Sequence, residues 1–280
     1  IIYYSDPGTP EPVRSALLEG ARWWNQAFEA IGYKDAFQVK MLPEDADPMD
    51  VRYNVIQWVH RSTRGWSYGA SITDPRTGEI IKGHVSLGSL RIRQDYMIAQ
   101  ALMNKPFANS DENYQPMLDL ALARIRQLSA HEVGHTLGFA HNFASSVNNR
   151  SSVMDYPHPL VKVKENEIDL SDAYANGIGD WDKVTVAYSY GDVPKGMTES
   201  WYLNDILEKA EAQGLRFITD SDARAATGAH PDAHLWDNGA NAAQELEDVL
   251  ALREKAIENF SLANIKTGEA LSTLEDVFVP

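Results

Sequence analysis

The stretch HEVGHTLGFAH, residues 131 to 141, constrains the fold of this chain more than any other part of the sequence. On an α-helix, residues four positions apart project from the same face, so His131 and His135 can reach one metal ion together. Glu132 is rotated by about 100° from His131, so its carboxylate can reach a water molecule at that ion but not the ion itself. Gly138 accepts the positive φ that ends a helix sharply, and His141 can then turn back to the same ion.

Three histidines beside one carboxylate match the protein groups around a catalytic zinc ion, which keeps its fourth position for water. The chain contains no Cys, so a metal must be held by His, Asp, Glu or Tyr. Two histidines four residues apart on a helix, with a Glu after the first, predict a zinc hydrolase in which the Glu is the general base. We therefore expect one catalytic Zn²⁺ held by His131, His135 and His141, with Glu132 as the base.

The first third of the chain alternates between strand and helix patterns, which predicts a small mixed sheet with helices and thus an α+β fold. Apolar residues at steps of three and four predict a long helix from about residue 113, with Pro116 in its first turn, that ends in the histidine stretch. Strands are predicted at residues 1–4, 37–42 and 54–60, together with a hairpin whose turn is 74–78. Other helices are predicted at 11–30, 90–103, 181–188, 204–213 and 242–260.

A second feature follows in SSVMDYP, residues 151–157, where Met154 lies 13 residues after His141. The complete pattern H-E-x-x-H-x-x-G-x-x-H is the metzincin signature, and metzincins place a methionine-containing turn, the Met-turn, beneath the metal. The chain therefore resembles metzincin zinc endopeptidases, specifically a group of large bacterial zinc-dependent metalloproteases with a Met-Asp-Tyr turn. Tyr156 stands two residues after the Met, where astacin-like and serralysin-like metzincins have a switchable zinc ligand.

The resemblance covers residues 1 to about 190 and implies a zincin-like fold, in which a mixed, twisted sheet and long helices lie above an active-site cleft. An upper subdomain, residues 1–141, would carry the sheet and the active-site helix. A lower subdomain, residues 142–280, would be irregular and helical, with the Met-turn and a helical extension from about residue 200.

The resemblance also implies a zinc-dependent endopeptidase that hydrolyses peptide bonds with a metal-activated water. Glu132 would take the proton of that water and pass it to the leaving amine, and Tyr156 would donate to the oxyanion. Gly138 and Met154 would be structural residues of the site. Asn142 differs from the residues that usually follow the third histidine in the well-known families, so no subfamily specificity is carried over.

Three alternatives remain open. Asp155, 20 residues after His135, is a second candidate for the third ligand, because another zincin family uses an aspartate. A catalytically inactive or non-proteolytic binding module of the same fold is opposed by Glu132, since loss of the base is the simplest route to an inactive relative. A zinc amidase that acts on cell-wall peptide would differ only in its substrate.

A peptide substrate needs an edge strand and a pocket. We expect residues 78–88 to form the sheet edge above the cleft, where an extended peptide adds as a strand. Residues 156–160 are expected to line the pocket for the side chain beyond the scissile bond. His158 in this segment is interpreted as a surface histidine.

Acidic residues outnumber basic ones by 40 to 25, which gives a formal net charge of −15. A chain of this charge without a basic stripe repels polyanions, so we expect a peptide or protein partner and no nucleic acid. No apolar run approaches the roughly 18 residues that a membrane helix needs. The chain begins at Ile1, and we expect a piece of a longer polypeptide that is exported to the periplasm, the cell envelope or the medium.

Residues 218–241 are rich in Asp and Asn, a composition that raises the possibility of calcium. The segment lacks the D-x-[DN]-x-[DN]-G spacing of a known calcium loop. We therefore expect a surface loop between two helices.

Overall fold

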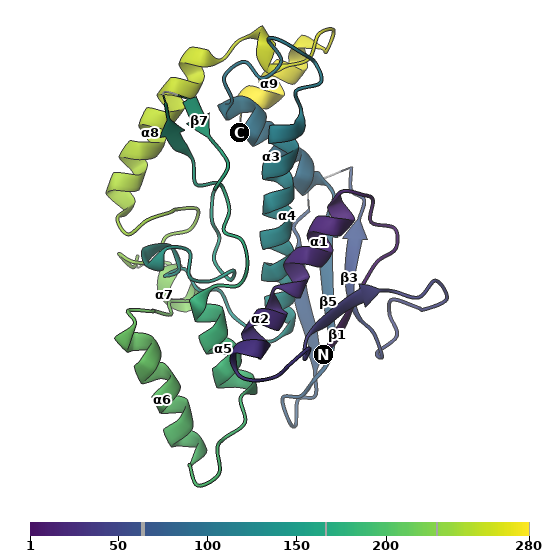
Figure 1. Ribbon diagram of the computed structural model, residues 1–280, viewed down its shortest axis with the longest axis vertical. Helices are drawn as coiled ribbons and strands as arrows, with labels where there is room; N and C mark the ends of the chain where they lie inside the picture. The colour runs from purple at the N-terminus through teal and green to yellow at the C-terminus, as the bar shows by residue number, and fades with distance from the viewer. Residues whose placement is uncertain (63–64, 166, 228, 280) are drawn as a thin grey trace.

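Helix α4 (Gln115–Thr136) lies in the middle of the molecule, between the sheet and the C-terminal helices (Figure 1). The computed structural model describes residues 1–62, 65–165, 167–227 and 229–279. Pro116 lies in the first turn of α4, where the missing N–H of proline has no helical partner to lose. The predicted long helix is therefore confirmed, and the first two histidines of the motif lie on its last turns.

Five strands form one mixed sheet in the order β2-β1-β3-β5-β4. They are β1 (Ile2–Ser5), β2 (Gln38–Met41), β3 (Asn54–Val59), β4 (Tyr68–Thr73) and β5 (Ile80–Gly88). The pairs β1–β2, β1–β3 and β3–β5 are parallel, and β4 pairs with β5 antiparallel as a hairpin, with Ala70 opposite His84. The predicted α+β fold with a mixed sheet is confirmed.

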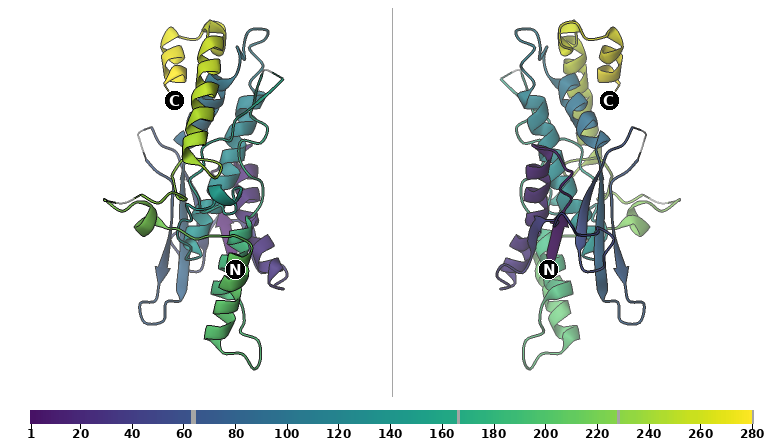
Figure 2. Two further views of the ribbon diagram at one scale, coloured as in Figure 1. Left: turned by 90° about the vertical axis from the view of Figure 1, so that its left-hand side faces the viewer. Right: turned by 90° about the vertical axis from the view of Figure 1, so that its right-hand side faces the viewer.

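Helices α1 (Val13–Arg22) and α4 pack closely against each other and on the sheet (Figures 1 and 2). A Cβ at Gly20 of α1 would collide with the carbonyl of Arg126, so the absence of a side chain there permits the close approach. Helix α2 (Trp24–Ala30) follows after Trp23, so the single helix predicted at 11–30 is divided into two. Helix α3 (Leu90–Leu102) packs beside α4.

The largest hydrophobic core lies between these helices and the sheet and continues to residues 151–157, the segment that resembles a Met-turn and is called the Met-turn below. Its members include Trp24, Phe28, Ile56, Val85, Leu87, Ile125, Val133, Phe139 and Met154. Residues from before and after Gly138 therefore share one core, which fixes the end of α4 relative to the chain that follows it.

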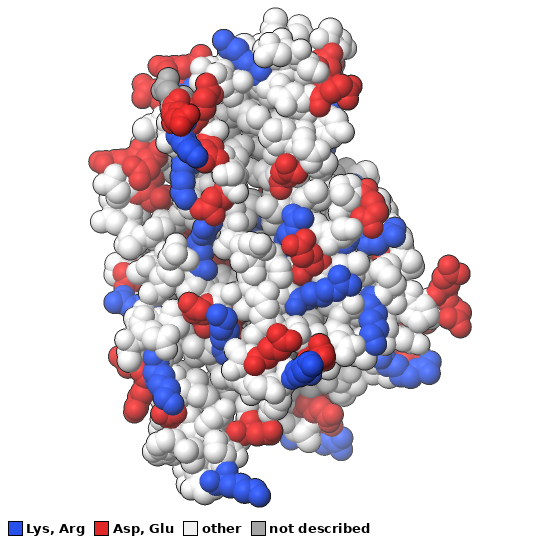
Figure 3. Space-filling view, viewed as in Figure 1, with Lys and Arg blue, Asp and Glu red and all other residues white. Residues whose placement is uncertain are grey.

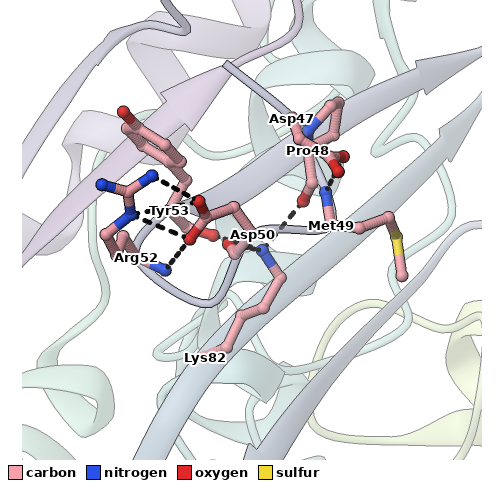
Figure 4. A network of polar contacts seen from close by, with 7 residues as sticks. All are labelled: Asp47, Pro48, Met49, Asp50, Arg52, Tyr53 and Lys82. Atoms are coloured by element: carbon pink, nitrogen blue, oxygen red, sulfur yellow. Dashed lines mark hydrogen bonds and ion pairs between the residues drawn. The ribbon is translucent and has the colours of Figure 1, made fainter.

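The expectation that residues 78–88 form the sheet edge is wrong. Strand β5 lies between β3 and β4, and β4 is the edge strand. Lys82 of β5 does not protect an edge, because it is buried and its ammonium group donates to the carbonyls of Pro48, Asp50 and Tyr53 (Figure 4). Lys82 instead holds the loop before β3 against the sheet.

The chain after Gly138 is less regular and carries several short elements. They are η1 (Ser146–Asn148), β6 (Lys162–Lys164), β7 (Glu167–Asp169), α5 (Asp180–Tyr190), α6 (Glu199–Ala212), α7 (Asp220–Ala223), α8 (Ala242–Asn259), η2 (Leu262–Asn264) and α9 (Leu271–Phe278). Figures 1 and 2 show α6 at one end of the long axis and α8 with α9 at the other. The helices predicted at 181–188, 204–213 and 242–260 correspond to α5, α6 and α8.

Figure 3 shows acidic and basic side chains interspersed over one face of the molecule, with acidic side chains gathered over α8. Several basic side chains form ion pairs with acidic ones, for example Arg126 with Glu19 at 2.6 Å. Within the described ranges, no helix has the length and apolarity that crossing a membrane requires.

Candidate functional site

The Nε2 atoms of three histidines meet at one point at the end of α4. The Nε2 of His135 lies 3.1 Å from the Nε2 of His131 and 3.1 Å from the Nε2 of His141. Nitrogens bound to one tetrahedral ion at about 2.0–2.1 Å would be separated by about 3.3 Å. The separations in the protein are therefore close to those that a zinc-sized ion requires.

The opposite ring nitrogen of each histidine has an oxygen partner. The Nδ1 of His131 lies 2.8 Å from the carbonyl of Val153, and the Nδ1 of His135 lies 2.9 Å from the carbonyl of Phe139. The Nδ1 of His141 lies 2.6 Å from a carboxylate oxygen of Asp220. With Nδ1–H as the donor in each case, all three Nε2 lone pairs face one another, which is unfavourable unless a cation lies between them.

Burial lowers the pKa of His131 well below its usual value, and burial also lowers the pKa of His135. These two imidazoles are therefore neutral near pH 7, the state in which a histidine binds a metal. Among the described residues, the side chains placed so that they could hold one metal ion together are His131, His135 and His141. Asp155 lies outside this group, so the structure favours His141 over Asp155 as the third ligand.

Gly138 produces the turn that returns His141 to the end of α4. Its φ is +95°, in the left-handed region that the sequence analysis expects of this glycine. The amide N–H of Phe139 donates back to the carbonyl of Gly134 at 3.1 Å. This closing hydrogen bond places the Phe139 carbonyl within reach of His135.

Glu132 lies beneath the edge strand β4. Its side chain is buried, and the N–H of Gly69 in β4 donates to its carboxylate. Burial raises the pKa of Glu132 to about 7, against the opposing effects of the Arg124 charge and the Gly69 N–H. A Cβ at Gly69 would collide with the carbonyl oxygen of Glu132, so the missing side chain allows β4 to pass directly over the base.

The half-buried Tyr156 stands against the histidines. Its ring centroid lies 4.5 Å from that of His141 and 5.4 Å from that of His131. On another side it stacks on Trp236, with ring centroids 5.2 Å apart and an interplanar angle of 16°. The phenol is thus held beside the point where the Nε2 atoms converge, and burial raises its pKa.

Met154 packs directly under the end of α4. A Cβ at Gly134 would collide with the sulfur of Met154 and lie 2.7 Å from a ring carbon of Trp24. The N–H of Asn142 donates to the carbonyl of Met154 at 3.0 Å, which joins the turn to the chain just after His141. Gly134 is therefore required by the Met-turn, although its position in the motif accepts any residue.

Asp182 of α5 supports the Met-turn from below. One carboxylate oxygen accepts the N–H of Val153 at 2.9 Å and the N–H of Gly179 at 2.8 Å, and the other accepts the hydroxyl of Ser152 at 2.6 Å. Asp182 is fully buried, and burial raises its pKa to about 6. Since the Val153 carbonyl in turn accepts from His131, Asp182 positions the first histidine indirectly.

The expectation of a surface loop at 218–241 is wrong for the residues of this segment that contact the histidine site and the chain next to it. Asp220 binds His141, and the N–H of Trp236 donates to the carbonyl of Tyr156 at 2.8 Å. The amide of Asn142 binds the carbonyl of Arg216 and the N–H of Ile218. Residue 228 within this segment lies outside the described residues.

These contacts were missed because they join residues about 80 positions apart. The acidic residues at the start of the short helix α7 give no local indication that one of them faces a histidine. Trp236 has a φ of +62°, which is uncommon for a bulky residue and which no sequence pattern predicts.

An apolar pocket of about 470 Å³ adjoins the site between α3, residues 158–161 and α8. Trp236 lines this pocket and also stacks on Tyr156, so it separates the pocket from the histidines. His158, interpreted as a surface histidine, is 25% exposed, and its Nε2 lies 2.9 Å from a carboxylate oxygen of Glu245 in α8.

The comparisons with known proteins agree with this geometry. A family model described as Met-zincin matches residues 113–280, which include α4, the Met-turn and the whole C-terminal segment. No curated protein and no solved structure matches the chain. The resemblance inferred from the sequence extended only to about residue 190, whereas this match also includes Asp220 and Trp236. The chain belongs to the Met-zincin family of the metzincin clan.

Proposed function

We propose that this protein is a zinc-dependent endopeptidase. The observation that carries the proposal is the convergence of three Nε2 lone pairs beside the buried carboxylate of Glu132. The three imidazoles are the ligand set of catalytic zinc, and each is oriented through its Nδ1 by an oxygen acceptor. A site with this donor set and an adjacent base supports metal-assisted hydrolysis.

Zinc held by His131, His135 and His141 would polarise the scissile carbonyl and lower the pKa of a water toward about 7. Glu132 accepts the proton of the attacking water and then delivers it to the leaving amine. The Gly69 N–H keeps the carboxylate in place for both transfers.

The phenol of Tyr156 donates to the oxyanion that forms on the carbonyl. Its ring lies against His141 and is backed by Trp236, so little side-chain freedom would be lost when the hydroxyl binds an oxyanion at the histidines.

The edge strand β4 supports an extended peptide as the substrate. Its outer side has no strand partner among the described residues, so a peptide can pair with it through main-chain hydrogen bonds. The Gly69 contact places Glu132 under this strand. The apolar pocket next to Trp236 would accept an apolar side chain of the bound peptide.

The Glu132→Gln variant tests the mechanism because it keeps the shape of the side chain and removes the base. We expect it to retain zinc and to hydrolyse peptides at least about 10²-fold more slowly than the wild type. Unchanged hydrolysis by Glu132→Gln would contradict the role of Glu132.

A digest of mixed denatured proteins, with products identified by mass spectrometry, tests the substrate class. We expect internal cleavage of protein chains that a chelator prevents and zinc restores. Release of cell-wall peptide without cleavage of protein chains would instead identify an amidase. A zinc-loaded protein that cleaves neither class would support a binding module.

A further inference from the structure

A polar cavity of about 300 Å³ lies next to the Met-turn. Its lining includes Asp155 of the Met-turn and Asp237 and Asn238 of the C-terminal segment. The two segments run side by side there, since the amide of Asn238 donates to the carbonyl of His158 at 3.3 Å. Among the described residues, the lining contains neither the three clustered histidines nor Glu132, so this cavity is separate from the proposed catalytic site.

Two carboxylates in the cavity are held against the same residue, Ser146. Its N–H donates to the carboxylate of Asp155, and its hydroxyl donates to the Oδ2 of Asp237 at 3.3 Å. Asp155 is only 4% exposed. The carboxylates of Asp155 and Asp237 therefore lie near each other in a space with little water. Ionisation of both is unfavourable there unless a cation is bound.

No lysine or arginine in the described part of the chain forms an ion pair with Asp155 or Asp237. Arg150 lines the cavity, but its guanidinium binds the carboxylate of Asp172 at 3.0 Å. Of the ionisable neighbours of Asp237, His234 lowers the pKa of its carboxyl and Glu245 raises it. No lysine or arginine of the described residues therefore neutralises the two carboxylates of the cavity when both are ionised.

Besides the hydroxyl of Tyr174, two buried oxygen atoms of the lining lack a hydrogen-bond partner among the described residues. They are the Oδ1 of Asp237 and the Oδ1 of Asn238, and Asn238 is only 3% exposed. Leaving a buried acceptor unsatisfied costs roughly 1–3 kcal/mol, and buried polar groups usually have partners. A buried amide oxygen that lines an acidic cavity indicates a missing ligand with positive charge.

We propose that this cavity binds one calcium ion through the carboxylates of Asp155 and Asp237 and the amide oxygen of Asn238. All of these donors are oxygens, which favours a hard cation over zinc. Calcium accepts six to eight oxygens in irregular geometry, and a space of this volume also holds several waters. Magnesium fits less well because it requires near-ideal octahedral geometry and loses its waters reluctantly.

The ion would connect the Met-turn to the C-terminal segment. Asp155 precedes Tyr156, and Asp237 follows Trp236, so the ligands flank the stacked pair of rings. Calcium would thereby stabilise the position of the segment that also brings Asp220 to His141.

Calcium titration of the zinc-loaded full chain tests the proposal, with thermal unfolding and terbium luminescence as readouts. We expect one calcium per chain and a rise in Tm on the order of 5 °C at a hundredfold excess over Kd. Terbium should displace calcium and emit on excitation of tryptophan, because Trp236 is adjacent to Asp237. The Asp237→Asn variant should lose both responses, whereas Asp248→Asn, which removes an exposed acid on α8, should keep them.

The order of stabilities separates a calcium ligand from a residue that only supports the fold. Without calcium, Asp237→Asn should be at least as stable as the wild type because it removes one of two like charges; with calcium it should be less stable. Lower stability in both conditions, an Asp237→Asn variant that still responds to calcium, or a wild type that does not respond would each overturn the proposal. The calcium response should persist in His135→Ala, so loss of the zinc site does not affect this test.

Discussion

The histidines of α4 and the histidine after the turn are positioned in different ways. His135 binds the carbonyl of Phe139, four residues away, whereas His141 binds Asp220, 79 residues away. His131 lies between these cases, because its partner is the Val153 carbonyl, 22 residues away in the Met-turn. One histidine is thus oriented by its own helix end, one by the neighbouring turn and one by the C-terminal segment.

The largest expected effect on stability concerns Asp182, the buried carboxyl that supports the Met-turn and is absent from the Asp182→Asn variant. The folded-state pKa of Asp182, about 6, lies above its ordinary value of 3.8. The stability contributed by the protonated carboxyl is therefore complete below about pH 4 and is lost as the pH rises through 6. Between pH 4 and pH 7 the wild type should lose about 2.5 kcal/mol of unfolding free energy relative to Asp182→Asn.

Urea unfolding of both proteins across this pH range would measure the difference. A shared His135→Ala background removes the contribution of metal release at low pH. Parallel stability curves would show that Asp182 does not ionise within the folded protein in this range.

Adding a methyl group at Gly134, where α4 packs on Met154, should have a somewhat smaller effect on the unfolding free energy. Gly134→Ala forces Met154 and Trp24 apart and should destabilise the fold by about 2 kcal/mol. The double variant with Met154→Ala should lose less than the sum of the two single variants, because the shorter side chain makes room for the new methyl group. Denaturant unfolding measures the three values, and strict additivity would argue against direct contact.

Removing the distant partner of His141 should weaken metal binding without unfolding the protein. Loss of a carboxylate partner of a ligating histidine usually reduces affinity by about 10- to 100-fold, and we expect Asp220→Ala to fall in this range. Competition with a chelating dye measures the zinc affinity. Asp222→Ala on the same short helix is the matched control, and equal affinities in the two variants would mean that His141 is oriented without Asp220.

The smallest expected effect concerns the ring that backs Tyr156. Trp236→Ala removes a stacked pair worth about 1 kcal/mol, which corresponds to a roughly fivefold fall in the hydrolysis rate. In a Tyr156→Phe background the same change should have little further effect, because the donating hydroxyl is already absent. Peptide hydrolysis rates of the four proteins measure this coupling, and a full fivefold fall in both backgrounds would contradict it.

The sequence predicted the part of the site that depends on helix geometry. The positions of His131, Glu132 and His135 follow from the spacing of residues on one helix. Gly138 predicts the turn after which His141 returns to the end of that helix. Helix periodicity and hairpin signals likewise predicted α4, the β4–β5 hairpin and the α+β class.

The contacts made by the returning chain could not be predicted in this way. Asp220, Trp236 and Asp182 act through single long-range contacts that leave no periodic pattern. The order of strands also escaped prediction, since periodicity indicates that β4 and β5 pair but not which of them meets β3. Long-range packing therefore decided the edge strand and the support of His141.

Zinc content is the most direct test of the central claim, that the three histidines form one metal site. Elemental analysis of protein purified without chelators should find close to one zinc per chain in the wild type, and none above background in His135→Ala. The Asp220→Ala variant should retain zinc at high free metal and release it to a weaker chelator than the wild type does. A folded wild type that binds no zinc, or a His135→Ala variant that still binds one, would contradict the account.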